Sequence, residues 1–250
     1  MWIVHKVVRA AYGALNTTRV LDTPIGQAAY RYLYEQYKRR DDDLKIRSLC
    51  DDIVPGTIAI DVGANIGTYA TAFAKSVSNG GIVLAIEADP YNAEILRRRF
   101  VNSCNLVRVI EAAASDRAGL LKLSRDEKNP AGHVLSSQGI DVRGVTLDDI
   151  VSDINLPVSV IKIDVEGAEP LVIRGSKRTI ERDRPTILLE YSPSRIAPFE
   201  PDPTSLLSYF RDLAYNCFLE GSAVPRSIQE VNLAAERRQY VDVLLRPTKR

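Results

Sequence analysis

The chain has 250 residues, of which 33 are Lys or Arg and 32 are Asp or Glu, so its formal net charge is +1. Hydrophobic residues make up 45% of the sequence and charged residues 26%, which is typical of a globular protein. A chain of this length can bury one sizeable core without disulfides or a structural metal. The balanced charge excludes a broad basic surface, so nucleic acid is not an expected partner.

Two regions are predicted along the chain, a helical N-terminal extension over residues 1–55 and the main domain over residues 56–250. Tyr30, Tyr34 and Tyr37 recur at helical spacing in the first region, which favours one aromatic helix face. In the second region, short apolar runs alternate with helical segments. The boundary is placed between residues 55 and 56 because the helical spacing of apolar residues gives way there to short apolar runs.

The start of the chain is predicted to be an amphipathic helix. His5, Lys6 and Arg9 interrupt its apolar residues, which argues against a signal peptide. We expect this helix to pack on the domain or on a second copy of the chain, as a homo-oligomer would require. Peripheral membrane contact through Trp2 is the alternative. No apolar run in the sequence approaches the roughly 18–20 residues that a spanning helix needs.

The three cysteines, Cys50, Cys104 and Cys217, are widely spaced and contain no Cys-x-x-Cys pair. They are interpreted as reduced thiols, rather than as a disulfide framework or a zinc site. This usage favours a cytoplasmic protein.

From residue 56, near-continuous apolar runs are expected to be strands buried on both faces. They lie at 57–61, 81–87, 106–110, 158–164 and 186–190. Helices are predicted at 68–77 and 90–101, the second with Asp89 as its N-cap and Pro90 at the first helical position. Such alternation predicts an α/β fold in which helices cover both faces of a parallel sheet.

A pair of strands, 119–124 and 141–145, is expected around a polar loop at 125–139. Thr146 then has the position of an N-cap for the next helix. A last helix and two last strands are predicted at 204–213, 216–219 and 240–245.

A glycine-containing turn follows the first predicted strand, with Asp61, Gly63, Asn65 and Gly67 at alternate positions. Gly63 and Gly67 allow a tight turn and a close approach of a ligand. Ligands of open α/β sheets bind at the carboxyl ends of the strands, where the strand order reverses. The spacing differs from the Gly-x-Gly-x-x-Gly fingerprint of dinucleotide sites, so the turn predicts a binding site of another kind.

Asp61 would repel a pyrophosphate but would attract a cationic ligand such as S-adenosylmethionine. Glu87 ends the second predicted strand, where a carboxylate can accept both ribose hydroxyls. Ser115 and Asp116 follow the third strand and are placed to contact the adenine edge. The alternative is that Asp61 only caps a helix, Glu87 is a solvated acid, and the third segment is an ordinary turn.

Residues 61–67, Asp-Val-Gly-Ala-Asn-Ile-Gly, and residues 161–169, Ile-Lys-Ile-Asp-Val-Glu-Gly-Ala-Glu, together resemble the FkbM family of S-adenosylmethionine-dependent methyltransferases. The resemblance covers roughly residues 53–191. It implies a Rossmann-like class I methyltransferase fold, with a seven-stranded, mostly parallel sheet whose last strand is antiparallel. It also implies methyl transfer to a hydroxyl group of a saccharide, a glycan or a secondary metabolite.

The same resemblance implies roles for the residues of the glycine turn and of the next strand ends. The methionine part of the cofactor would be lined by Asp61, Gly63, Asn65 and Gly67, its ribose held by Glu87, and its adenine edge by Ser115 and Asp116.

Asp164, at the end of the fourth predicted strand, is the first candidate for the general base or for the group that positions the acceptor. A contact with the cofactor's amino group or with nearby backbone is the alternative. Glu190 ends the fifth strand and could converge with Asp164 on the acceptor. No metal is expected, although two such carboxylates could hold Mg²⁺. Glu169 is interpreted as an acid in the first turn of a helix.

His133 lies in the polar stretch and could serve as a base, because an imidazole titrates near neutral pH. An exposed histidine without a catalytic role is the alternative. Two other functions remain open at this point: an NAD(P)-dependent oxidoreductase and a non-catalytic cofactor-binding protein.

Overall fold

The computed structural model describes residues 23, 42–103, 105–126 and 129–248. The chain divides into two compact units, residues 1–47 and 48–250. The predicted N-terminal helix, with Trp2 and the tyrosine face, lies outside the described residues. Within the first unit, residues 42–47 are helical. The predicted domain boundary after residue 55 stays a prediction.

The second unit is built on a seven-stranded sheet with the order β10-β11-β9-β8-β1-β2-β3. The strands are β1 (Ile58–Val62), β2 (Ile82–Glu87), β3 (Val107–Glu111), β8 (Val158–Ile163), β9 (Thr186–Tyr191), β10 (Tyr215–Leu219) and β11 (Val241–Pro247). β11 runs antiparallel to both of its neighbours, whereas β9, β8, β1, β2 and β3 pair in parallel. The predicted sheet and its antiparallel last strand are therefore confirmed.

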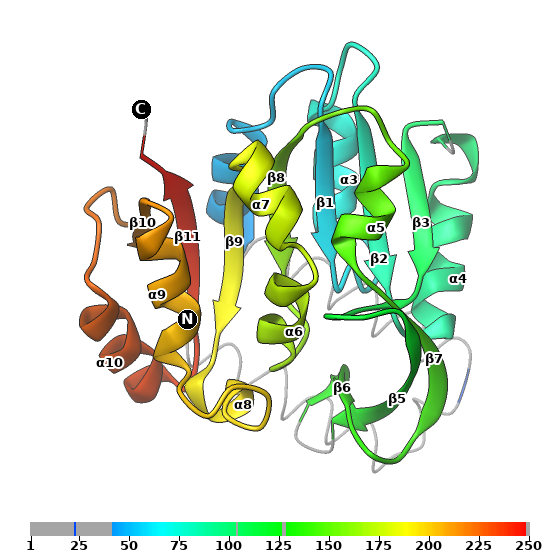
Figure 1. The fold of residues 1–250 in the computed structure, drawn as a ribbon. Coiled ribbons are helices and arrows are strands. Elements are labelled where there is room, and N and C mark those ends of the chain that lie inside the picture. The colour runs from blue at the N-terminus through cyan, green and yellow to red at the C-terminus, as the bar shows by residue number, and fades with distance from the viewer. Residues whose placement is uncertain (1–22, 24–41, 104, 127–128, 249–250) are drawn as a thin grey trace. The chain divides into compact units, whose positions relative to one another are not determined.

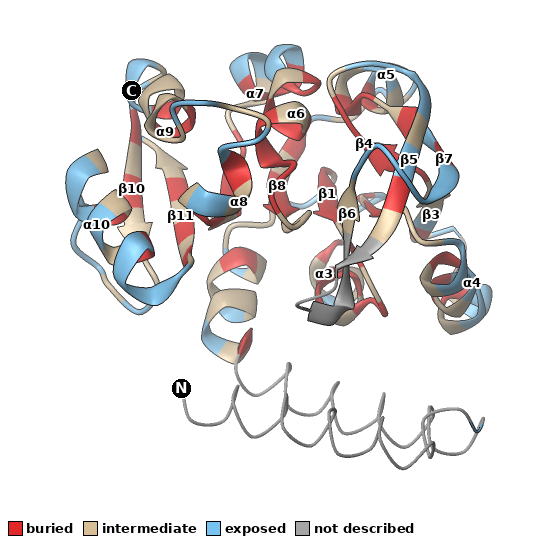
Figure 2. Cartoon of the chain, turned by 90° about the horizontal axis from the view of Figure 1, so that it is seen from below, coloured by how far each residue is buried: buried red, intermediate tan, exposed pale blue. Residues whose placement is uncertain are grey.

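Helices cover both faces of this sheet (Figure 1). α3 (Thr68–Ser76) and α4 (Pro90–Arg99) lie behind it, and α5 (Leu147–Ser152), α6 (Glu169–Arg174), α7 (Lys177–Asp183) and α9 (Thr204–Asp212) lie in front. Further helical segments are the 3₁₀ turn Val101–Ser103, α8 (Pro193–Ile196) and α10 (Ile228–Arg238). Buried residues concentrate on the central strands, as Figure 2 shows. This burial explains the near-continuous apolar runs of the sequence.

Two of the predicted helix caps are present. The Asp89 side chain accepts a hydrogen bond from the Asn92 N–H at 2.9 Å, and Pro90 occupies the first turn of α4. The Thr146 hydroxyl accepts from the Asp149 N–H at 3.0 Å and starts α5. These caps satisfy N–H groups that a helix start leaves without backbone partners.

A second, four-stranded sheet interrupts the chain after β3, with the order β4-β7-β5-β6. Its strands are β4 (Ala113–Ala114), β5 (Gly119–Asp126), β6 (Asn129–Leu135) and β7 (Ile140–Val145). The prediction of a loop over 125–139 was wrong, because β6 pairs with β5 from Leu135 opposite Leu123 to Asn129 opposite Asp126. The polar composition of this stretch, with its turn-forming residues, favours a loop. The strand forms because it pairs with β5.

Within the described part of the chain, no helix combines the length and the apolar character needed to cross a bilayer.

Candidate active site

The strand order reverses between β1 and β8, since the chain continues from β1 to β2 on one side and reaches β8 on the other. The glycine turn connects β1 to α3 at this point. Gly63, Asn65 and Gly67 all have positive φ angles, of 70°, 51° and 88°. A glycine, or an Asn in the left-handed region, suits such a backbone. The turn therefore lies where α/β sheets bind their ligands.

Close packing of the chain on itself also requires the two glycines. A Cβ atom added at Gly63 would lie 1.9 Å from the Asp164 carbonyl oxygen, and one at Gly67 would lie 2.7 Å from Leu96 Cδ2. Gly63 thus lets the turn after β1 contact the segment after β8, and Gly67 lets α3 start against α4. The sequence had suggested a tight turn and the approach of a ligand as the reasons for these glycines, and packing is a third reason.

The Asp61 carboxylate is completely buried beneath this turn. Its Oδ2 accepts a hydrogen bond from the Ala70 N–H at 2.9 Å, in the first turn of α3. Gly67, at the N-cap, has no side chain that could do so. Asp61 therefore does cap the helix, and burial raises its pKa while the Lys162 ammonium opposes that shift.

Lys162 is the site residue for which the sequence suggested no role. It lies on β8 directly opposite Asp61, and its Nζ is 3.4 Å from Asp61 Oδ1. The same ammonium donates to the carbonyl oxygens of Gly63 at 2.8 Å and Val62 at 3.3 Å. A lysine inside an apolar run that is buried on both faces was the available signal, because a buried charge requires partners.

Asp164 follows β8 and lies beside both the lysine and the glycine turn. Its Oδ2 is 3.6 Å from Lys162 Nζ, and its backbone N–H donates to the Val62 carbonyl at 3.2 Å. The Asp164 side chain retains 23% of its exposure, against 1% for Asp61. Of the two carboxylates beside Lys162, Asp164 is the one that solvent can reach.

Glu87 joins the end of β2 to the same turn. Its Oε2 accepts a hydrogen bond from the Asn65 N–H at 2.6 Å, and its Oε1 accepts from the Asp89 N–H at 2.9 Å. Burial raises the pKa of Glu87 to about 7, although both hydrogen bonds favour the carboxylate. Each oxygen retains a lone pair for a further donor such as a hydroxyl group.

Residues 61–217 match the sequence profile described as the methyltransferase FkbM domain, which is more than half of the chain. The chain belongs to the FkbM methyltransferase family. The family resemblance of the two sequence motifs is thereby confirmed, and a nicotinamide-dependent oxidoreductase is not favoured.

Individual relatives of this FkbM chain include the 2-O-methyltransferase NoeI of Sinorhizobium fredii, which is 28% identical over 189 residues covering 66% of this chain and 76% of NoeI. Among solved structures, the methyltransferase FkbM from Methylobacillus flagellatus KT superposes with a TM-score of 0.48 at 18% identity, covering 77% of this chain but 44% of the other. The chain therefore spans less than half of that protein. An O-methyltransferase from Bacillus cereus in complex with SAH gives a TM-score of 0.41 at 15% identity, over 75% of this chain and 72% of the other.

The loop between Asp164 and α6 of the FkbM chain is held by Glu169, the first residue of α6. Glu169 Oε1 accepts from the N–H groups of Val165 and Gly167, both at 3.1 Å. Burial raises the pKa of Glu169 to about 7. The sequence had suggested an acid in the first turn of a helix. The structure shows in addition that this acid binds the loop that precedes the helix.

Ser115 and Asp116 lie after β4, where Ser115 is buried and its hydroxyl donates to Asp116 Oδ1 at 3.3 Å. Asp116 Oδ2 is 3.7 Å from Arg174 Nε of α6. The segment is connected to Glu87, since the Ala112 N–H donates to the Glu87 carbonyl at 2.9 Å. Both predicted adenine-edge residues therefore follow β4, on a segment that is hydrogen-bonded to the end of β2 at Glu87.

Glu190 lies within β9, opposite Asp242 of β11. Its predicted convergence with Asp164 stays a prediction. His133 belongs to β6, where its backbone pairs with Arg125, so the expected loop position of this histidine was wrong. The His133 side chain lies outside the described residues, and its suggested role as a base stays a prediction.

Proposed function

We propose that this chain is an S-adenosylmethionine-dependent O-methyltransferase that acts on a hydroxyl group of a saccharide or of a secondary metabolite. The observation that carries the proposal is the convergence of Asp61, Glu87 and Asp164, at the ends of β1, β2 and β8, on the point where the strand order reverses in an FkbM chain. That point is the usual ligand site of the architecture.

The chemistry of these residues fits the cofactor. Bound there, S-adenosylmethionine supplies an electrophilic methyl group on a cationic sulfur. Two carboxylates, those of Asp61 and Asp164, flank the single ammonium of Lys162. The negative charges outnumber the positive charge, which suits a cationic ligand. Glu87 would hold the ribose hydroxyls through its remaining lone pairs.

Further contacts with the cofactor are proposed from the sequence motifs. Its methionine part would lie against Asp61, Gly63, Asn65 and Gly67, and its adenine edge against Ser115 and Asp116. Calorimetry with S-adenosylhomocysteine tests this arrangement. Glu87→Ala is expected to lower the affinity markedly, while Glu94→Ala on the exposed face of α4 leaves it unchanged. Failure of the native chain to bind would remove the proposal.

Asp164 is proposed to orient the acceptor hydroxyl and to accept its proton. Its partial exposure and its hydrogen-bonded backbone give it access to solvent on a fixed support. A general base of this kind contributes typically about 10²–10⁴-fold to the rate. In Asp164→Asn, turnover is expected to fall by that range while affinity for S-adenosylhomocysteine mostly survives. The reverse pattern would reassign Asp164 to the cofactor.

The acceptor is proposed to be a hydroxylated molecule because of the named activity of the relative NoeI, a 2-O-methyltransferase. Incubation with radiolabelled S-adenosylmethionine and a cell extract, followed by identification of the labelled product, would establish its class. Labelling of a saccharide or a metabolite oxygen is expected. Binding of the cofactor without transfer to any fraction would indicate a non-catalytic binding protein.

Transfer is proposed to need no divalent metal. Glu190 is followed by Tyr191, whose hydroxyl is 3.0 Å from Asn232 Oδ1 of α10 and is therefore committed to the fold. Position 191 therefore supplies neither a carboxylate nor an amide ligand, although Asp242 of β11 lies opposite Glu190. Turnover should survive exhaustive dialysis against EDTA. Loss of turnover that Mg²⁺ restores would overturn this part of the proposal.

A further inference from the structure

Lys162 lies between a carboxylate of the cofactor turn and the candidate acceptor-side carboxylate. Its Nζ is 3.4 Å from Asp61 Oδ1 and 3.6 Å from Asp164 Oδ2. Hydrogen bonds to the Val62 and Gly63 carbonyls fix the ammonium beneath the turn. The side chain is 6% exposed, so water screens its charge weakly.

The three side chains form a charge set that is not neutral. Two carboxylates and one ammonium sum to one negative charge, and the set without Lys162 would carry two. A buried charge acts over several ångströms, because the effective dielectric of a protein is about a quarter of that of water. The lysine therefore determines how strongly the strand ends attract any cation that binds beside them.

We propose that Lys162 is a positioning residue that sets the preference of the site for the sulfonium donor over its demethylated product. This inference rests on the proposed function. S-adenosylmethionine and S-adenosylhomocysteine share every other group, and they differ by one methyl group and one positive charge. Their affinity ratio therefore reports the charge of the site more directly than either affinity does.

The consequence for turnover follows from the loss of sulfonium charge as a methyl group is transferred. Carboxylates with no counter-charge stabilise the bound cation more than the transition state, and such ground-state stabilisation slows the reaction. Lys162 offsets one of the two carboxylates. The lysine thereby weakens the attraction of the site for the sulfonium. Asp61 can still cap α3, and Asp164 can still bind the acceptor hydroxyl.

The first test compares the two ligands by calorimetry at one pH and one ionic strength. Lys162→Met keeps much of the side-chain length and removes the charge. The ratio of the dissociation constants, product over donor, is expected to rise by about tenfold, which corresponds to about 1.4 kcal/mol. Lys75→Met, on the exposed face of α3, is the matched control and should leave the ratio unchanged.

A second pair of variants avoids the buried, uncompensated carboxylate that Lys162→Met leaves behind. Asp61→Asn keeps an oxygen acceptor for the Ala70 N–H, and the ratio should fall by about tenfold. Adding Lys162→Met to Asp61→Asn restores the net charge of the set, so the ratio should return to the native value. This comparison remains available if the single lysine variant does not fold.

The outcomes separate the two proposals. If the native chain binds neither ligand, the proposed function fails. If it binds both, but the ratio stays within about twofold in every folded variant, the role assigned to Lys162 is overturned. A parallel loss of both affinities at a constant ratio would mean that Lys162 only supports the turn.

Discussion

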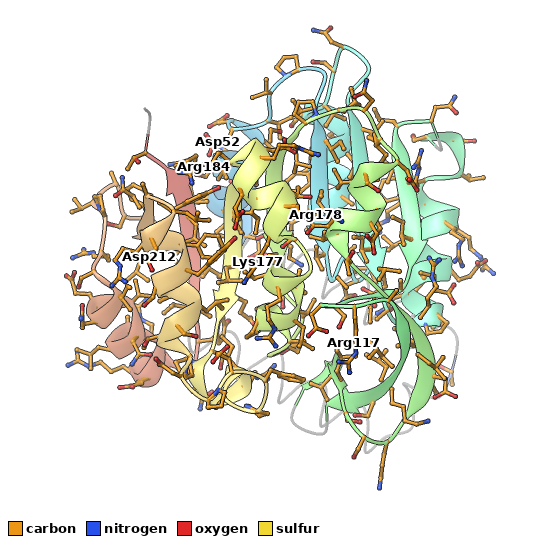
Figure 3. The ribbon with its side chains drawn as sticks, viewed as in Figure 1. Asp52, Arg117, Lys177, Arg178, Arg184 and Asp212 are labelled. Carbon is orange, nitrogen blue, oxygen red and sulfur yellow. The ribbon has the colours of Figure 1, made fainter. Side chains whose placement is uncertain are left out.

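Two clusters in this protein have the same composition, one cation between two aspartates, but differ in burial. At the carboxyl edge of the sheet, Lys162 lies 3.4 Å from Asp61 and 3.6 Å from Asp164. On the outer layer, Arg178 of α7, which is labelled in Figure 3, lies 3.4 Å from Asp148 and 3.3 Å from Asp149. The distances alone do not distinguish the two clusters.

Exposure distinguishes them. The Lys162 side chain is 6% exposed, whereas the Arg178 side chain is 72% exposed. Water and salt screen the outer cluster, so its ion pairs contribute little to stability. The inner cluster has lost hydration that its ion pairs and hydrogen bonds must replace. We infer that the inner charges are kept for the ligand that they attract, and the outer charges for local helix geometry.

The largest effect is expected for Lys162→Met on the free energy of unfolding. The variant leaves the buried Asp61 carboxylate without its cation, which costs about 3–5 kcal/mol when a buried pair is broken. Denaturant unfolding of the native and variant chains measures the difference. Lys75→Met, at an exposed site, should change it by less than about 0.5 kcal/mol. Equal stabilities of the two variants would contradict the contrast between the clusters.

Glu169 is a buried carboxylate that accepts hydrogen bonds from backbone N–H groups and has no cation in the described contacts that hold it. The second expected effect is that the free energy of unfolding depends on pH. Burial raises the pKa of Glu169, and likewise of Glu87, from 4.5 to about 7. The folded chain then binds these protons more tightly than the unfolded chain does. The stability that each of these groups contributes is therefore fully present below its unfolded pKa and is lost as pH rises through about 7, by on the order of 3 kcal/mol for each group.

The matched variant is Glu169→Gln, which keeps an oxygen for the Val165 and Gly167 N–H groups and does not titrate. It should remove the part of this fall in stability that Glu169 contributes, on the order of 3 kcal/mol between acidic and neutral pH. Glu236→Gln, at an exposed position of α10, should retain all of it. Superimposable pH profiles for native and Glu169→Gln chains would refute the pKa assignment.

Much of the fold was predictable because its signals are local. The apolar runs located β1 and β9 to within about one residue, and Asp89 followed by Pro90 located the start of α4. β6 was missed because it depends on pairing with β5. α10 was missed although Ser227 and Glu230 form a capping box that the sequence displays.

The site was predictable in part for a related reason. The strand ends identified Asp61, Glu87 and Asp164, because carboxyl ends of parallel strands share one edge. Lys162 received no role, since only the register between β1 and β8 reveals that it faces Asp61. Sequence spacing locates a residue along a strand, and register decides which residue it meets on the next one.

A smaller effect is expected for Asp148→Ala in the outer cluster. Asp148 Oδ1 accepts from the Thr179 N–H and hydroxyl, both at 2.8 Å, near the start of α7. These contacts resemble a helix cap, so their loss should cost about 1–2 kcal/mol in denaturant unfolding. Asp149→Ala, with a side chain 64% exposed, is the control and should cost much less. Equal losses would mean that the ion pair, rather than the cap, stabilises this helix start.

The smallest effect is expected for Arg178→Met, and it completes the contrast with Lys162→Met. The substitution also removes one cation between two carboxylates, but Asp149 is 64% exposed, and Asp148, which is 9% exposed, keeps its hydrogen bonds from Thr179. The loss should be below about 1 kcal/mol and should shrink as salt is added, because screening weakens exposed pairs. The Lys162→Met loss should depend little on salt. If both losses responded equally to salt, burial would not be what separates the two clusters.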